Sequence, residues 1–390
     1  MTDICELCRH HALEPVYEPE GSTRGLKVHL CRHCGLVQST PRLDRATRAP
    51  AAVSAGADWG NVRYGKGFRT RAALDVLKRH ADFSSDIALL DVGSNRGSFT
   101  RAFADAAPAA RVVAIEPDER VAGSVRGHER AELITARIED AALESGRFDI
   151  VHSCHTLEHV AEPMRVLADH WRVLKPNGLL LIDVPNIALI DVDDIVEEWF
   201  IDKHLTHFSA RTLMRMIAAS GFEIVVPPDA ADRENLLIVA RKSNAASPAR
   251  EADPREVDAA ERLLIAYGTN RARNLAALTA VAAEIARLAP RRVAMWGAGR
   301  LFDSLVRHGH FNPGALALLV DKHLKAHVPT RHGRTLFEPE ALKDVDPGVI
   351  VVMSRGFAGE IAEEARALAP KAEIVLYTDL MALAHMERAA

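Results

Sequence analysis

Two short stretches of the chain concentrate side chains that can bind a metal or exchange a proton. The first is EEWFIDKHLTHFS, residues 197–209, which holds carboxylate, ammonium and imidazole groups side by side. The second is the amino-terminal region, where residues 1–40 contain four of the 5 cysteines. The first stretch could be a solvated loop, a metal site or the edge of an active site, so the elements around it must decide.

The amino-terminal cysteines form two CxxC pairs, Cys5 with Cys8 and Cys31 with Cys34. Two such pairs in one short segment suit tetrahedral coordination of zinc by four thiolates. Because protein ligands would fill all four positions, we predict a structural zinc site, which supplies the folding energy of a unit too small to bury much core. We expect the metal of the chain to lie at these pairs and not in residues 197–209.

Composition limits the possible classes of function. The chain has 390 residues, a net charge of -4, 48% hydrophobic and 26% charged residues. These values are typical of a soluble globular protein and provide no broad attraction to nucleic acids or anionic lipids. We find neither a membrane-spanning apolar run nor a signal-peptide pattern, so we expect a cytoplasmic protein with reduced thiols.

Periodicity divides the rest of the chain into two α/β regions. From residue 86 to 241, short apolar runs alternate with helical runs, which predicts a parallel sheet with helices on both faces. A second alternating region begins at residue 291, after one or two long helices over 255–289. We therefore predict four parts: a zinc-binding unit (1–45), an α/β domain (46–243), a linker with helices (244–289) and a Rossmann-like α/β domain (290–390).

The segment IALLDVGSNRGSFTRAFADAA predicts a buried strand, a glycine-bearing turn and a helix. Asp91 ends the strand, and Gly93 and Gly97 flank a turn that lets a ligand approach the backbone. This GxxxG spacing differs from the GxGxxG of dinucleotide binding, which disfavours NAD. Glu116 ends the next strand, where a carboxylate can accept hydrogen bonds from ribose hydroxyls. Together these features favour a nucleoside-containing cofactor.

Four segments in order, DVGSNRGSF, AIEP, FDIVHSCHTLEHV and LKPNGLLLIDVPN, resemble the motifs of class I S-adenosylmethionine (SAM) methyltransferases. The resemblance implies a Rossmann-like sheet of seven strands, closed by an antiparallel hairpin within residues 222–242. Asn95 stands where the family often has another glycine. The implied cofactor contacts are Asp91, Gly93 and Gly97 at the amino acid end of SAM, Glu116 at the ribose, Arg137 and Ile138 near the adenine, and Ser153 to His155 under the methionine moiety.

The order of a CxxC unit, a SAM domain and a carboxyl-terminal α/β domain resembles the sugar C-methyltransferases of deoxysugar biosynthesis. That resemblance implies a nucleotide-linked keto-sugar as substrate. A base would remove a proton beside the ketone, and the enolate carbon would take the methyl group. Where that family has a Tyr-His-Glu-His-Leu run, this chain has residues 201–205, Ile-Asp-Lys-His-Leu, so only the last histidine is retained.

The predicted position of residues 197–209 suggests roles for their side chains. The stretch follows the fifth strand, and Ser209 is a good N-cap for the following helix, so residues 197–208 should form a loop or lid at the methyl end of SAM. We expect Glu197 and Glu198 to be exposed. His204, or His159 in LEHV, could remove the acceptor proton. Lys203 or His207 could stabilise the enolate.

The carboxyl-terminal domain contains a weaker motif of the same kind. Gly297 and Gly299 lie in the turn of VAMWGAGR, and Asp321 ends the next strand. We expect this domain to hold the nucleotide or sugar part of the substrate, or to be structural or dimerising, with Arg300 and Arg355 as candidate anion contacts.

Two alternatives to carbon methylation of a sugar remain open. One is O- or N-methylation of a sugar or another natural-product intermediate. The other is a zinc-containing binding or scaffold module with a degenerate SAM fold. The protein is expected to act as a monomer or a homodimer.

Overall fold

The computed structural model describes residues 4–42, 67–122, 125–243, 252–326 and 328–389. The described residues form two compact units, the first comprising 4–42, 67–190 and 199–264, and the second 191–198 and 265–389. The boundaries predicted near residues 45 and 244 lie outside the described residues. Helix α7, Pro254–Arg287, is shared by both units and confirms the long helix predicted over 255–289.

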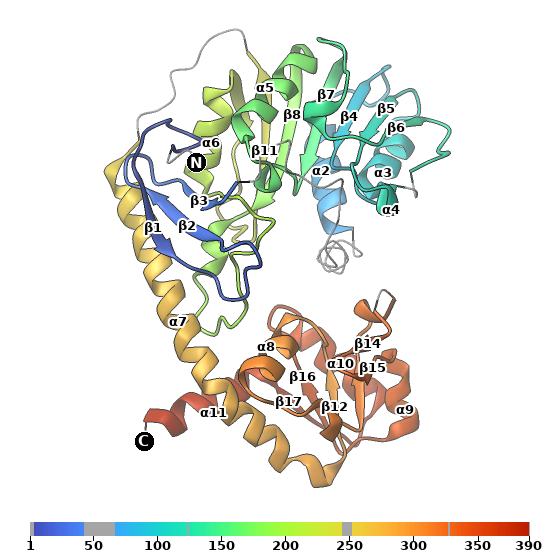
Figure 1. Ribbon diagram of the computed structural model, residues 1–390. Helices are drawn as coiled ribbons and strands as arrows, with labels where there is room; N and C mark the ends of the chain where they lie inside the picture. Colours follow the sequence, from blue (N-terminus) through green and yellow to red (C-terminus); the bar gives the residue numbers. More distant parts are fainter. Residues whose placement is uncertain (1–3, 43–66, 123–124, 244–251, 327, 390) are drawn as a thin grey trace. The chain divides into compact units, whose positions relative to one another are not determined.

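A seven-stranded mixed sheet forms the centre of the first unit (Figure 1). The strand order is β10-β11-β8-β7-β4-β5-β6, and β11 runs antiparallel to both of its neighbours, whereas the other pairs are parallel. This topology confirms the predicted sheet and its closing hairpin. The strands are β4 (Ala88–Val92), β5 (Arg111–Ile115), β6 (Ala131–Ile134), β7 (Phe148–Cys154), β8 (Leu174–Pro185), β10 (Phe222–Val226) and β11 (Asn235–Lys242).

Alternate side chains of these strands bury both faces of the sheet, as expected for a central parallel sheet. Leu90 and Ile182 belong to the core cluster on the side of α5 and α6. Leu89 and Leu181 belong to the cluster on the side of α2 and α3. The helices of this unit are α2 (Phe68–Lys78), α3 (Ser98–Ala106), α4 (Glu119–Ala122), α5 (Pro163–Val173) and α6 (Ala210–Ala219).

The cysteine-bearing segment folds as a small antiparallel sheet within the first unit. Its order is β1-β2-β3-β9, formed by Leu13–Tyr17, Lys27–Cys31, Val37–Thr40 and Thr206–His207. Strand β9 comes from the far end of the 197–209 stretch, and Val37 pairs with His207. A pattern of two residues is too short to predict a strand, so only the tertiary structure shows that this loop joins the sheet.

The second unit contains a four-stranded parallel sheet, as the second alternating region predicts. Its order is β13-β12-β16-β17, from Leu318–Val320, Val293–Trp296, Val349–Val352 and Glu373–Leu376. A two-stranded hairpin joins β14 (Thr330–Arg331) to β15 (Arg334–Thr335). The remaining helices are α8 (Arg300–His308), α9 (Leu342–Val345), α10 (Ala358–Leu368) and α11 (Tyr377–Ala389).

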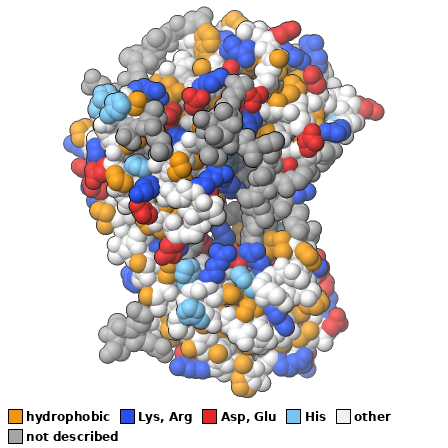
Figure 2. All heavy atoms as spheres, viewed as in Figure 1, with side chains coloured by type: hydrophobic (Ala, Val, Ile, Leu, Met, Phe, Trp, Pro, Cys, Tyr) orange, Lys and Arg blue, Asp and Glu red, His pale blue; other side chains and the backbone are white. Residues whose placement is uncertain are grey.

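The surface carries charges of both signs. Figure 2 shows acidic and basic side chains interspersed on the visible face, in line with the net charge of -4. None of the described helices combines the length and the apolar composition needed to cross a membrane.

Candidate active site and metal centre

The predicted cofactor turn lies between β4 and α3 and requires glycine at two points. Gly93 and Gly97 have φ values of 74° and 70°, in the left-handed region. A Cβ atom on Gly93 would lie 2.1 Å from Thr156 Oγ1, and one on Gly97 would lie 2.2 Å from a Val125 methyl. Asn95 also has a positive φ, 49°, which asparagine tolerates better than most residues. The turn is therefore a close-packed backbone loop at the carboxyl end of β4.

Asp91 fixes this turn from its buried side. Its carboxylate accepts a hydrogen bond from Thr100 Oγ1 (2.5 Å) and lies 2.7 Å from His152 Nδ1. The residue is 1% exposed, and His152 is stacked on Phe99. Both carboxylate oxygens are thus engaged within the protein. The structure favours a positioning role for Asp91, whereas direct contact with the amino acid end of SAM remains a prediction.

Glu116 connects the turn to the neighbouring strand β5. Its Oε2 accepts a hydrogen bond from the Asn95 N–H (2.8 Å), and Oε1 accepts one from the Asp118 N–H (2.9 Å). Burial raises the pKa of the Glu116 carboxyl. Each carboxylate oxygen can accept a second hydrogen bond, so Glu116 can still meet ribose hydroxyls at this edge.

The residues expected near the adenine lie after β6. Ile138 is 3% exposed and belongs to the core, at the start of the short 3-10 helix Ile138–Asp140. Arg137 precedes it in an extended conformation and is partly exposed. Ile138 can therefore form a wall of an adenine site, while Arg137 is the more accessible of the two.

Strand β7 brings the next predicted residues beside the cofactor turn. Ser153 pairs with Val92 of β4, and its buried Oγ has no hydrogen-bond partner among the described residues. His155 follows with a φ of 49°, and its N–H donates to the Asp183 carbonyl. Because β4 and β7 are parallel, the glycine turn and His155, which follow them, lie at the same carboxyl-terminal edge of the sheet.

A histidine–glutamate cluster, which we define as Glu158, His159 and His204, follows His155. One carboxylate oxygen of Glu158 and one ring nitrogen from each histidine all lie within 4.8 Å of one another. The ring centroids of His159 and His204 are 4.8 Å apart. His155 Nδ1 lies 3.4 Å from Glu158 Oε1, which extends the cluster towards β7. The fold thus unites His159 and His204, the two histidines predicted to act as bases.

The tautomer of neutral His159 follows from its hydrogen bond. His159 Nδ1 lies 2.9 Å from the Lys203 carbonyl, which can only accept, so Nδ1 carries the hydrogen. The lone pair of Nε2 then faces Glu158 Oε1 at 3.6 Å. Burial, together with the Lys203 charge, lowers the pKa of His159 and His204, so both are neutral at pH 7.

Glu158 is the cluster residue that our sequence interpretation missed. Its side chain is 2% exposed, and burial raises its pKa to about 8. Its signal was available in LEHV, where Glu158 precedes His159 and follows His155 by three positions. A carboxyl group between two histidines is therefore a candidate functional group, as the two histidines are.

The four amino-terminal cysteines also come together. Their sulfur atoms lie within 4.8 Å of one another, with 3.5 Å between Cys5 and Cys34 and 3.6 Å between Cys8 and Cys31. Thiolates at about 2.3 Å from a tetrahedral zinc ion are about 3.8 Å apart. The donor set and its spacing therefore fit the predicted zinc ion, with all four positions supplied by the protein.

Residues 66–226 match the family described as a methyltransferase domain. They contain the glycine turn, Glu116 and the histidine–glutamate cluster. This segment is therefore similar to methyltransferase domains, including those of relatives named as SAM-dependent.

Curated relatives match parts of the chain. An uncharacterized methyltransferase of Mycolicibacterium gilvum is 36% identical over 118 residues, covering 29% of this chain and 46% of that protein. A probable S-adenosylmethionine-dependent methyltransferase of Mycobacterium tuberculosis is 28% identical over 165 residues, covering 39% and 58%. The C-methyltransferase NovU of Streptomyces niveus is 24% identical over 204 residues, covering 51% and 47%. The chain spans about half the length of the curated relatives it matches.

Among solved structures, the complex between the Haloferax volcanii Trm112 methyltransferase activator and a putative methyltransferase is similar to part of the chain. The alignment has a TM-score of 0.41 and 17% identity, and it covers 48% of this chain and 95% of that chain.

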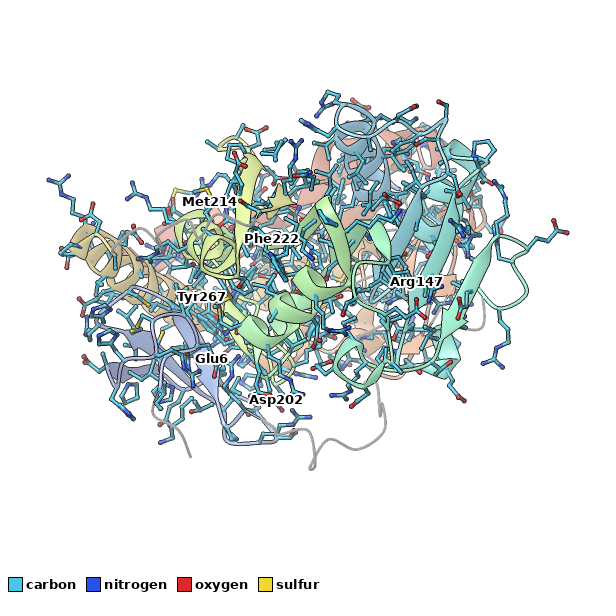
Figure 3. The ribbon with its side chains drawn as sticks, turned by 90° about the horizontal axis from the view of Figure 1, so that it is seen from above. Glu6, Arg147, Asp202, Met214, Phe222 and Tyr267 are labelled. Carbon is cyan, nitrogen blue, oxygen red and sulfur yellow. The ribbon has the colours of Figure 1, made fainter. Side chains whose placement is uncertain are left out.

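The segment that forms the cysteine-bearing sheet, residues 13–42, also holds the loop that carries Lys203 and His204. Asp202 accepts hydrogen bonds from Ser22 Oγ (2.5 Å), Thr23 Oγ1 (2.7 Å) and the Thr23 N–H (3.0 Å). Figure 3 shows Asp202 beside the amino-terminal strands. On the other side of His204, Arg42 donates to the Leu205 carbonyl (2.7 Å). The loop is thus fixed to this amino-terminal segment both before and after His204.

The structure does not support a catalytic role for His207. Its Nε2 lies 2.9 Å from Ser39 Oγ, and its ring meets Phe200 edge-on at 4.7 Å between centroids. The residue is 4% exposed, and burial lowers its pKa to about 3. His207 therefore packs within the amino-terminal sheet as part of β9 and is not a member of the histidine–glutamate cluster.

The expected exposure of Glu197 and Glu198 is wrong. Their side chains are only 15% and 16% exposed, and both lie in the second unit. Arg355 donates to both carboxylate oxygens of Glu197, each at 2.7 Å, and Glu198 accepts from Tyr267 (2.7 Å). The predicted anion contact of Arg355 is thus occupied by a carboxylate of the chain itself.

The second unit repeats the glycine turn in a more closed form. Asp321 Oδ2 accepts from the Ala298 N–H (3.0 Å), and Oδ1 accepts from His323 and Leu324. Gly297 has a φ of 110°, and a Cβ there would lie 2.7 Å from the Met353 carbonyl. Backbone groups already satisfy this carboxylate, which favours a structural turn.

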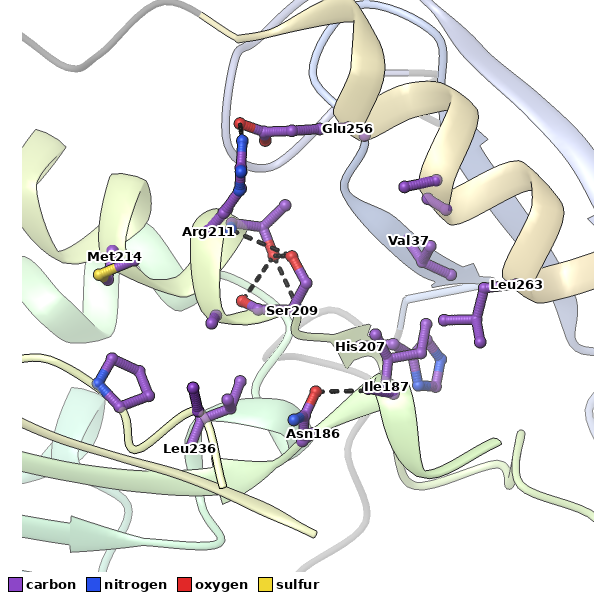
Figure 4. A pocket seen from close by; sticks show the side chains of 18 of the residues that line it. Val37, Asn186, Ile187, His207, Ser209, Arg211, Met214, Leu236, Glu256 and Leu263 are labelled. Carbon is purple, nitrogen blue, oxygen red and sulfur yellow. Dashed lines mark hydrogen bonds and ion pairs between the residues drawn. The ribbon is translucent and has the colours of Figure 1, made fainter. Parts of the chain in front are cut away.

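The first unit also has a cavity of about 650 Å³ (Figure 4). It is lined by the chain after β8, the β10–β11 connection and the first turns of α6 and α7, including Asn186, Pro228 and Glu256. At its edge, Ser209 caps α6 through the Thr212 N–H, which confirms the predicted N-cap. The histidine–glutamate cluster does not line this cavity.

Proposed function

We propose that the protein transfers a methyl group from SAM to a carbon atom of a nucleotide-activated keto-sugar. The observation that carries this proposal is the histidine–glutamate cluster at the end of β7, next to the cofactor turn on β4. The relation to NovU, whose name describes a C-methyltransferase, supports the carbon acceptor. The zinc ion is proposed to be structural.

The residues divide the chemistry between them. When bound, SAM supplies an electrophilic methyl group on its sulfonium. Neutral His204 accepts the proton beside the ketone, since its imidazole has a free lone pair at pH 7. The developing enolate oxygen meets positive potential from Lys203, which also lowers the pKa of His159 and His204.

Bond making and breaking then balance. The electron pair of the broken C–H bond forms the enolate, the enolate carbon forms the new C–C bond, and the C–S bond breaks to leave S-adenosylhomocysteine. Because Glu158 and His159 follow β7 and the turn follows the adjacent strand β4, positioning of the two reactants supplies much of the rate.

Two measurements test this function. Calorimetry with SAM and S-adenosylhomocysteine should show binding, and its absence would remove the enzymatic role. Incubation with labelled SAM and a panel of nucleotide sugars, followed by NMR of the product, identifies the acceptor and the methylated atom. A labelled methyl group on an oxygen or nitrogen atom of the product would exclude carbon methylation in favour of O- or N-methylation.

His204→Ala tests the proposed base. Turnover should fall about 10²- to 10⁴-fold, the usual range for a general base, while SAM affinity stays within about twofold. His323→Ala, at a half-buried histidine of the second unit, is the matched control and should leave both unchanged. Unchanged turnover in His204→Ala would exclude this residue as the base.

A further inference from the structure

We propose that Glu158, His159 and His204 bind a divalent cation at the acceptor side of the methyl-transfer site. Their three ligand atoms lie within 4.8 Å of one another and come from two separate segments of the chain. Two imidazoles and one carboxylate form a donor set that suits zinc and other divalent transition metals. The earlier expectation that residues 197–209 take no part in metal binding is thereby revised.

The first argument is the state of Glu158. The residue is 1% exposed, and neither carboxylate oxygen has a hydrogen-bond partner among the described residues. Buried carboxyl groups normally have hydrogen-bond donors, because removing them from water is costly. Oε1 points instead between His155 Nδ1 (3.4 Å) and His159 Nε2 (3.6 Å). A cation among these atoms would supply the missing partner.

The second argument is the orientation of His159. Its Nδ1–H donates to the Lys203 carbonyl, so Nε2 presents a lone pair towards Glu158. Metal-binding histidines typically donate the other ring N–H to a carbonyl or carboxylate in this way. Ligands at about 2.1 Å from a cation are about 3.0–3.4 Å apart in octahedral or tetrahedral sites. The 3.6 Å between His159 Nε2 and Glu158 Oε1 needs only a small contraction, and the His204 ring nitrogen, within 4.8 Å of both partners, needs a larger one.

Two positively charged side chains, Arg69 and Lys203, lie near the proposed site and would repel a bound metal ion. Arg69 Nη1 lies 3.8 Å from Asp183 Oδ2, so a second buried carboxylate offsets its charge. Lys203 remains the cation whose field reaches Glu158 and both histidines. Removing that ammonium should therefore strengthen binding, the opposite of removing a ligand.

A cation at this place would narrow the class of acceptor. Three protein ligands leave room for two adjacent oxygen atoms of the substrate, as in an α-hydroxyketone or a vicinal diol. Coordination of the ketone oxygen would stabilise the enolate, while a hydroxide ion from solvent takes the proton of the adjacent C–H bond and becomes water. His159 and His204 would then serve as ligands in place of a free base. This role in the reaction rests on the proposed function, whereas cation binding itself does not.

Cobalt(II) titration of the zinc-loaded full chain tests the proposal. We expect one cobalt ion per chain beyond the zinc, with the weak visible absorption of nitrogen and oxygen ligands and without the strong charge-transfer band of thiolates. Glu158→Gln should weaken binding at least tenfold, and Lys203→Gln should strengthen it severalfold. Glu162→Gln, at an exposed carboxylate nearby (62%), is the matched control and should leave binding unchanged.

The possible outcomes separate this proposal from the proposed function. Circular dichroism and zinc content establish that each variant is folded. No cobalt uptake, or equal uptake by Glu158→Gln, overturns the cation site. If SAM still binds in calorimetry, the methyltransferase function stands with His204 as a free base. Cobalt uptake without SAM binding would leave the metal site intact and remove the enzymatic role.

Discussion

The cysteine site and the histidine–glutamate cluster gather metal-binding side chains in the same unit, yet they differ in closure. At the cysteine site, Cys5, Cys31 and Cys34 are at most 2% exposed, and four thiols meet one another. In the cluster, Glu158 is buried but 31% of the His159 side chain is exposed. A closed donor set stabilises a fold, whereas an open one can take substrate.

The segment that contains the cysteine site also contacts the loop that contributes His204 to the histidine–glutamate cluster. The sheet that carries the cysteines contains β9 and holds Asp202 through Ser22 and Thr23. His204 lies between these two attachments in the sequence. The chemistry of the cluster should therefore depend on the integrity of the cysteine site, although no cysteine belongs to the cluster.

The largest expected effect comes from opening the closed site. Cys5→Ser should release the zinc ion and unfold the β1–β3 sheet, because metal binding supplies several kcal/mol to so small a unit. Zinc content by mass spectrometry and thermal unfolding measure the loss. Cys154→Ser, at the remaining cysteine, should keep the zinc. Retention of zinc in Cys5→Ser would show that the four thiols are not a metal site.

An effect of intermediate size is expected from His170, a buried histidine outside both proposed metal sites. It tests how much the burial of an imidazole by itself changes stability with pH. His170 in α5 is 0% exposed, its ring nitrogens have no hydrogen-bond partner among the described residues, and burial lowers its pKa to about 4. The unfolded chain, with a pKa near 6.5, binds this proton first, so stability is complete above about pH 6.5 and is lost as the pH falls towards 4.

Denaturant unfolding at pH 7 and pH 4.5 measures this contribution. Each unit by which the pH falls from 6.5 towards 4 lowers the free energy of unfolding by about 1.4 kcal/mol. His170 should therefore lower the stability by about 2 to 3 kcal/mol at pH 4.5. His170→Leu should lose that much less stability between the two pH values than the wild type. Identical losses would mean that His170 is solvated or partnered when protonated.

The smallest effect is expected from loosening the connection between the two sites. Asp202→Asn weakens three hydrogen bonds to a charged acceptor, so the loop with Lys203 and His204 should be less well positioned. We expect turnover to fall about tenfold, with zinc content and SAM affinity unchanged. Asp258→Asn, at an exposed position of α7, is the control. Full turnover in Asp202→Asn would show that the two sites work independently.

The local patterns of the sequence determined the framework of the protein. Three features depend on residues that are close in the chain. Leu89 and Leu90 face opposite sides of the sheet, Gly93 and Gly97 adopt left-handed conformations, and the cysteines are spaced as CxxC pairs. They predicted a parallel sheet, the cofactor turn and the convergence of four sulfur atoms, because strand alternation and tight turns depend mainly on near neighbours. The number of seven strands followed from the resemblance to class I SAM methyltransferases.

Only the tertiary structure decided how the polar groups of residues 197–209 are used. Glu197 binds Arg355, Asp202 binds Ser22 and Thr23, and His207 packs near Ser39. Each partner is far away in the sequence, so no local pattern shows whether a charged residue is solvated, paired or free. The same reason concealed Glu158, whose importance depends on His204 arriving from the loop to complete the cluster.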